Sequence, residues 1–121
     1  MITDELKALV KKEAENLKKY AKLEELEKLD FTKFNGESSI GCPYGQMTGD
    51  CFSERATELL NLCSQSYSAH ILRYSKPIEK AFEGGEHRCS CSPIEFYTAQ
   101  QGAKPEALIN FLKGKTEILN L

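Results

Sequence analysis

A glycine-punctuated segment places the strongest local constraint on how this chain can fold. Gly41, Gly45 and Gly49 recur at every fourth residue, and glycine readily takes positive φ or admits another backbone at close range. Cysteine, tyrosine, methionine and phenylalanine side chains within residues 42–52 bring apolar bulk that flexible Gly/Ser linkers lack. The pattern therefore predicts a structured turn that folds back on itself and is held in place.

After Ser53 the spacing of apolar residues becomes helical, which predicts that the segment runs directly into an amphipathic helix. Either Asp50 or Ser53 can supply the side-chain oxygen that caps the first free amides of this helix. The positions expected to face inward are Ala56, Leu59, Leu60, Cys63 and Tyr67.

The first thirty residues predict a long amphipathic helix that begins after Thr3, a hydroxyl cap followed by two acidic residues. Apolar residues at later positions, Leu23, Leu26 and Leu29, step by three and drift to a different side. The helix therefore either bends near residues 20–22 or contacts a different partner with its second half. Its first apolar face comprises Leu6, Leu9, Val10, Ala14, Leu17, Tyr20 and Ala21.

Residues 31–121 predict a loop-rich group of shorter helices. Proline opens each expected helix and glycine ends it, and Ser92 with Glu95 has capping-box spacing. Residues 68–74 either continue the central helix or form a short strand, and the last six residues form a short strand or an extended tail. We expect a mainly α, compact single domain over residues 1–121, with at most a minor β element. The expected short helices span residues 77–83, 93–101 and 105–113.

Composition and charge exclude several classes of protein. Sixteen basic and eighteen acidic residues give a net charge of −2, so the whole chain lacks the positive excess typical of nucleic-acid binding. An acidic amino terminus and the lack of any 18-residue apolar run predict neither a signal peptide nor a membrane span. We therefore expect a cytoplasmic protein whose five cysteines are reduced thiols.

The best electrostatic candidate for partner binding is a line of lysines on the first helix. Residues 3–22 carry six lysines and four acidic residues, whereas residues 23–30 carry one lysine and four acidic residues. RNA phosphates or an acidic protein groove are suitable partners for such a line, and a solvated helix face with ion pairs along it is the alternative. The candidate binding residues are Lys7, Lys11, Lys18 and Lys22, together with Tyr44 and Gln46 on the edge of the central loop.

Zinc is the sharpest chemical hypothesis, because four thiol or imidazole ligands can surround it tetrahedrally. The spacing differs from that of zinc knuckles, so the alternative is small buried thiols and loop thiols without metal. A small zinc-binding module that acts on or near nucleic acid is therefore the second functional hypothesis. The candidate ligands are Cys42, Cys51, His87, Cys89 and Cys91.

Catalysis is not predicted. Cys51, His70 and Asp50 supply the residue types of a nucleophile, a base and an orienting group, but no flanking signature of a catalytic cysteine accompanies them. The glycine segment matches neither common phosphate-binding motif. We accordingly expect no enzyme and no required cofactor.

The segment from Cys42 to Ala56, with the sequence CPYGQMTGDCFSERA, resembles a signature in small uncharacterised proteins of bacterial phages and prophages. Residues 92–97 (SPIEFY) and 108–114 (LINFLKG) are similar to the ends of those proteins. The resemblance implies a mobile-element context and no particular reaction. It implies a protein that binds and disables a host factor, most concretely an anti-CRISPR acting on an RNA-guided nuclease complex.

Overall fold

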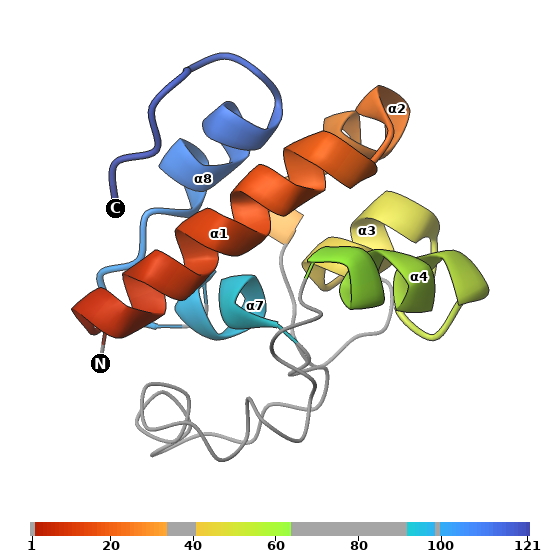
Figure 1. Cartoon of the computed structure of the whole chain (residues 1–121), viewed down its shortest axis with the longest axis horizontal. Helices are drawn as coiled ribbons and strands as arrows, with labels where there is room; N and C mark the ends of the chain where they lie inside the picture. The colour runs from red at the N-terminus through yellow and green to blue at the C-terminus, as the bar shows by residue number, and fades with distance from the viewer. Residues whose placement is uncertain (1, 34–40, 64–91, 99) are drawn as a thin grey trace.

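The computed structural model describes residues 2–33, 41–63, 92–98 and 100–121 (Figure 1). These residues form helices and connecting segments and contain no strand, so the mainly α prediction is confirmed. None of the helices in these ranges is long and apolar enough to cross a membrane. The elements are α1 (Asp4–Tyr20), α2 (Leu23–Glu27), a 3-10 turn η1 (Phe31–Lys33), α3 (Pro43–Thr48), α4 (Glu54–Cys63), α7 (Pro93–Thr98) and α8 (Pro105–Leu112).

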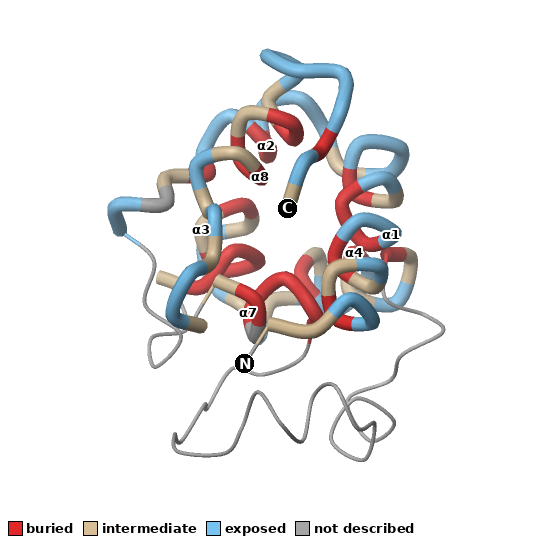
Figure 2. Tube along the Cα trace, turned by 90° about the vertical axis from the view of Figure 1, so that its left-hand side faces the viewer, coloured by how far each residue is buried: buried red, intermediate tan, exposed pale blue. Residues whose placement is uncertain are grey.

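The long helix α1 is the element around which the others pack, and it contacts α4, α7 and α8 (Figure 1). It begins as predicted, because the Thr3 hydroxyl oxygen accepts a hydrogen bond from the Leu6 amide at 3.1 Å. Buried positions follow the inner sides of the helices (Figure 2). On α1 these positions are Leu6, Val10, Glu13, Ala14 and Leu17.

The chain does not form a single helix through residue 30. Of the two alternatives that the leucine spacing left open, the bend near residues 20–22 is the one present in the structure. Ala21 and Lys22 both have extended backbone, which separates α1 from α2. The break rotates the chain so that Leu26 and Leu29 also reach the core, where both are buried. A straight helix would point them away from the face that Leu17 buries, because their spacing differs from the helical repeat.

The glycine segment contains a short helix where the sequence predicted only a turn. Cys42 precedes α3, and its sulfur accepts a hydrogen bond from the Gly45 amide at 3.4 Å. Gly45 lies inside α3 and is buried. The tight turn is confined to Gly49, whose φ of 95° ends α3 in the left-handed region. The chain then enters α4, where the Ser53 hydroxyl oxygen accepts from the Ala56 amide at 3.2 Å.

The carboxyl-terminal part largely follows the prediction. The Ser92 hydroxyl oxygen accepts from the Glu95 amide at 3.4 Å and so caps α7, although α7 ends at Thr98, three residues earlier than expected. Gly102 and Gly114 have the expected positive φ. The last six residues form neither a helix nor a strand and bend at residues 117–118; Leu119 is buried and Ile118 is 72% exposed. The predicted helix at residues 77–83 and the alternative strand at residues 68–74 lie outside the described residues.

Candidate functional site

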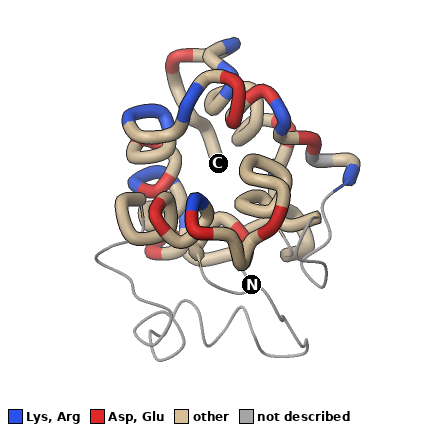
Figure 3. The backbone as a smooth tube through the Cα atoms, turned by 90° about the vertical axis from the view of Figure 1, so that its right-hand side faces the viewer, with Lys and Arg blue, Asp and Glu red and all other residues tan. Residues whose placement is uncertain are grey.

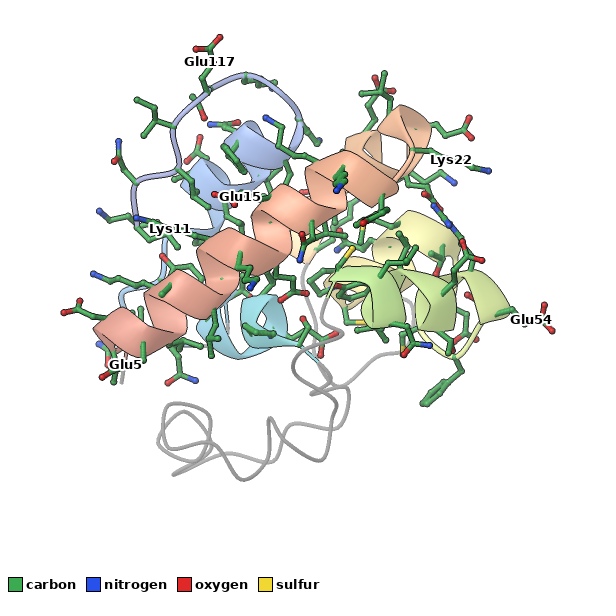
Figure 4. The ribbon with its side chains drawn as sticks, viewed as in Figure 1. Glu5, Lys11, Glu15, Lys22, Glu54 and Glu117 are labelled. Carbon is green, nitrogen blue, oxygen red and sulfur yellow. The ribbon has the colours of Figure 1, made fainter. Side chains whose placement is uncertain are left out.

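The lysine face, by which we mean Lys7, Lys11, Lys18 and Lys22, lies along the outer side of α1. Lys11, Lys18 and Lys22 are exposed, and Lys7 is half-buried. Lys22 lies beyond the end of α1, at the start of α2 (Figure 4). Glu15 lies one helical turn from both Lys11 and Lys18, on the same side of the helix. The face is therefore positive but interrupted by one carboxylate.

A groove runs beside the lysine face, between α1 and the carboxyl-terminal tail. Its volume is about 440 Å³. The Lys18 ammonium lies 4.2 Å from the centre of the Phe111 ring, a cation–π distance. The lysine face is thus one wall of a groove, which the sequence pattern did not reveal. The lining residues are Lys11, Glu15, Lys18, Phe111, Glu117, Ile118 and Leu119.

Lysine, arginine and acidic residues are spread over all the described ranges (Figure 3), but their balance differs between two parts of the sequence. Residues 2–22 carry six lysines and four carboxylates, one of which, Glu13, is buried. Residues 23–33 and 41–63, which include α2, α3 and α4, carry seven carboxylates and three basic residues. The molecule therefore presents a positive region on α1 and a negative region on α2 to α4.

The Glu13 carboxylate joins three helices inside the core. Its Oε2 accepts a hydrogen bond from the Tyr44 hydroxyl on α3, and its Oε1 accepts from the Ile94 amide at the start of α7 at 2.9 Å. Glu13 is only 2% exposed. From the sequence this glutamate counted only toward the local charge of residues 3–22, and its buried role was not predicted. Its position three residues after Val10 and four before Leu17 was the available signal, because that spacing places it on the buried face.

Tyr44 is not placed where the sequence predicted, whereas Gln46 is half-buried. Tyr44 is fully buried, so its side chain is not available to a partner. The Gln46 amide nitrogen donates to the Asp30 and Gly41 carbonyl oxygens, each at 3.1 Å, while its oxygen accepts from the Asp30 amide at 2.8 Å. Both residues hold the glycine segment against its neighbours. The expected surface role of Tyr44 is wrong, and that of the half-buried Gln46 stays a prediction.

Arg55 connects α4 to the break between α1 and α2. Its Nε and Nη2 donate to the two carboxylate oxygens of Glu25 at 2.8 and 2.7 Å, the bidentate geometry of a strong ion pair. Nη2 also donates to the Tyr20 carbonyl oxygen at 3.3 Å, and Nη1 contacts Glu58. Glu25 in turn accepts the Lys22 amide at 2.9 Å. This cluster was not predicted from the sequence, because Arg55 lies thirty residues or more from both Glu25 and Tyr20.

Acidification is expected to destabilise the fold through Glu25. The Arg55 hydrogen bonds hold the pKa of the Glu25 carboxyl below its ordinary value of 4.5, against the opposing effect of burial. Because the folded pKa is the lower one, the pair stabilises the fold above about pH 4.5 and its contribution is lost as pH falls through the folded pKa. We expect the free energy of unfolding, measured with urea at a series of pH values from neutral to below 4.5, to fall less steeply with decreasing pH for Glu25→Gln than for the wild type. Equal slopes would contradict the assignment, and Glu58→Gln, with an exposed carboxylate, serves as the control.

The cysteines within the described chain do not form a metal centre. No group of three or more histidine, cysteine or acidic side chains that could hold a metal ion occurs in this part of the chain. Cys42 and Cys63 are buried and Cys51 is half-buried, while His87, Cys89 and Cys91 lie outside the described ranges. Burial, reinforced by the negative charge of Glu13, raises the pKa of the Cys63 thiol to about 12. Cys63 is therefore a neutral core side chain near pH 7, and the zinc hypothesis stays a prediction.

The residue types considered for catalysis are not brought together by any described contact. Asp50 Oδ1 accepts from the Phe52 amide at 2.8 Å within a tight turn, which gives this carboxylate a structural task. His70 lies outside the described residues. Comparison with known proteins adds no assignment, since no protein-family model, curated protein or solved structure matches the chain.

Proposed function

We propose that this chain is a non-catalytic interaction protein of the phage or prophage type. It binds a host protein or ribonucleoprotein complex in the bacterial cytoplasm and inhibits or redirects it. The concrete form of the proposal is an anti-CRISPR that acts on an RNA-guided nuclease complex. That form depends on the resemblance of residues 42–56 to phage and prophage proteins.

The observation that carries the proposal is the exposed lysine face on a firmly held helix. Lys11 and Lys18 are exposed on α1, whose opposite side is buried against α4, α7 and α8. Charges on a pre-ordered scaffold lose little conformational entropy when they bind, and a positive face accelerates encounter with an anionic partner. RNA phosphates or an acidic protein surface are the partner chemistries that fit.

Charge reversal on this face should weaken binding. We expect the Lys11→Glu/Lys18→Glu variant to capture its partner from bacterial lysate at least about tenfold less well, because two attractive charges become repulsive. If the chain is an anti-CRISPR, the wild type should inhibit DNA cleavage by a purified guide-loaded nuclease, and the Lys11→Glu/Lys18→Glu variant should inhibit this cleavage less.

The matched control carries the same change in charge on a different surface. Lys28 directly follows α2, Lys33 lies in η1, and both are exposed, so Lys28→Glu/Lys33→Glu should capture the partner as well as the wild type does. Equal capture by both double variants would remove the lysine face from the proposal. Turnover of a substrate that a single-residue substitution abolishes without unfolding the chain would end the non-catalytic proposal.

A further inference from the structure

We infer that the lysine face binds a protein surface and rejects RNA, and that the bound surface carries a basic side chain between two carboxylates. The inference rests on the proposed function and names the chemistry of its partner. It comes from the carboxylates that lie among the lysines.

Lysines and carboxylates alternate along the exposed side of α1. Glu15 is exposed and lies four residues after Lys11 and three residues before Lys18, spacings that make side chains neighbours on a helix. Figure 4 shows Lys11 and Glu15 on the side of α1 that faces α8. Lys7 likewise has Asp4 three residues before it. Every lysine of the face that lies within α1 therefore has a carboxylate neighbour.

The groove beside the lysine face has the same mixed charge. Its charged lining consists of two lysines, Lys11 and Lys18, and two glutamates, Glu15 and Glu117, so the lining has no net charge. Binding of RNA depends on basic side chains that neutralise phosphates, and carboxylates within the contact repel a phosphate strand. The groove lining therefore opposes RNA.

Glu15 is available to a basic side chain of a partner. Within the described ranges it forms no salt bridge, and the Lys18 ammonium lies 4.2 Å from the centre of the Phe111 ring. The row from Lys11 through Glu15 to Lys18 extends roughly 10 Å, because a helix rises about 1.5 Å per residue. A protein surface with a carboxylate, a basic group and a carboxylate at this spacing can form three ion pairs with the row.

These ion pairs determine which partner binds more than how tightly it binds. Each exposed pair contributes little affinity, whereas like charges brought together exclude a competing partner. Ile118 is 72% exposed and lines the same groove, so it can add apolar contact with a protein. Glu15 and Glu117 are therefore the specificity-determining residues of this surface.

Reversing the charge of these two glutamates tests the inference, because the change should act in opposite directions on protein and RNA. We expect Glu15→Lys/Glu117→Lys to capture the partner from bacterial lysate at least about tenfold less well than the wild type does. Fluorescence anisotropy with labelled oligouridine in about 0.15 M salt should show RNA binding that is at least about tenfold tighter for the variant. Both glutamates are exposed, so the substitutions leave the core intact.

The matched control carries the same change in charge outside the groove. Glu27 on α2 and Glu54 on α4 are exposed, and neither lines the groove. Glu27→Lys/Glu54→Lys should capture the partner as the wild type does. Its gain in RNA affinity should be smaller than that of Glu15→Lys/Glu117→Lys, because its new lysines do not adjoin the lysine face.

Three results would overturn the inference. One is wild-type binding to oligouridine that Lys11→Glu/Lys18→Glu abolishes, since the lysine face would then be an RNA site. Another is loss of captured partner when excess oligouridine is added to the lysate. The third is capture by Glu15→Lys/Glu117→Lys equal to that of the wild type.

The same measurements separate this inference from the proposed function. A wild type that captures no partner would end the proposed function. The RNA measurement uses purified components, so it tests whether Glu15 and Glu117 exclude RNA whatever the lysate yields. Capture that depends on Lys11 and Lys18 but is competed by oligouridine would keep the proposed function and overturn the inference.

Discussion

Replacing Glu13 with alanine should lower the free energy of unfolding by about 3 kcal/mol, because it leaves buried donors without their acceptor. The Tyr44 hydroxyl and the Ile94 amide both donate to this carboxylate, and all three groups are buried. The loss also removes the link between α1, α3 and α7. Urea unfolding monitored by circular dichroism measures it directly.

The neighbouring carboxylate on α1 supplies the control. Glu15 is exposed, so Glu15→Ala should change the free energy of unfolding by less than about 0.5 kcal/mol. A double-mutant cycle of Glu13→Ala with Tyr44→Phe should give a coupling energy of about 1–3 kcal/mol. Equal effects of Glu13→Ala and Glu15→Ala, or independent effects in the cycle, would contradict the role assigned to Glu13.

Replacing Arg55 with alanine should lower the free energy of unfolding by about 2–3 kcal/mol. The Glu25 side chain that Arg55 pairs with is only 9% exposed, and a carboxylate at such a site is costly once its cation is gone. Part of the loss is avoided because the Lys22 amide still donates to Glu25 and because Arg55 itself is 27% exposed. Equilibrium unfolding at neutral pH gives the magnitude.

Two further variants separate the buried pair from the exposed one. Glu58 also pairs with Arg55, but its side chain is 59% exposed, so Glu58→Ala should cost less than about 1 kcal/mol. The double variant Glu25→Leu/Arg55→Met should recover part of the stability lost in Arg55→Ala, because it removes the unpaired charge. If Glu58→Ala proves as damaging as Arg55→Ala, the stabilisation assigned to Glu25 is wrong.

Local features of the chain were predictable because neighbouring residues determine them. The Thr3 and Ser53 caps and the inward positions of Leu6, Val10, Ala14 and Leu17 depend on hydroxyl and apolar residues within a few positions of one another. Tyr20 was expected on the same face but is 38% exposed, because α1 ends at this residue. The bend at residues 20–22 was also predictable from neighbouring residues, since the leucine spacing changes there. Helix α3 was missed because three glycines suggested a turn, whereas Gly45 is in fact buried inside the helix.

Interactions between distant residues were not predictable in this way. A glutamate in a lysine-rich helix is normally a surface residue, and only the approach of Tyr44 and Ile94 makes Glu13 a core acceptor. The same holds for Arg55, whose partner Glu25 is thirty residues away. Tyr44 was expected at the surface because nothing local reveals the carboxylate that receives its hydroxyl.

The amino-acid sequence by itself determined the helical class, where α1, α4, α7 and α8 begin, and the alignment of lysines on one side of α1, because periodicity and capping act over single turns of helix. Only the tertiary structure decided which charges are buried, that the lysine face borders a groove, and that Phe52 remains outside the core. Those properties depend on which surfaces the packed helices cover, and chain segments far apart in sequence supply the covering groups.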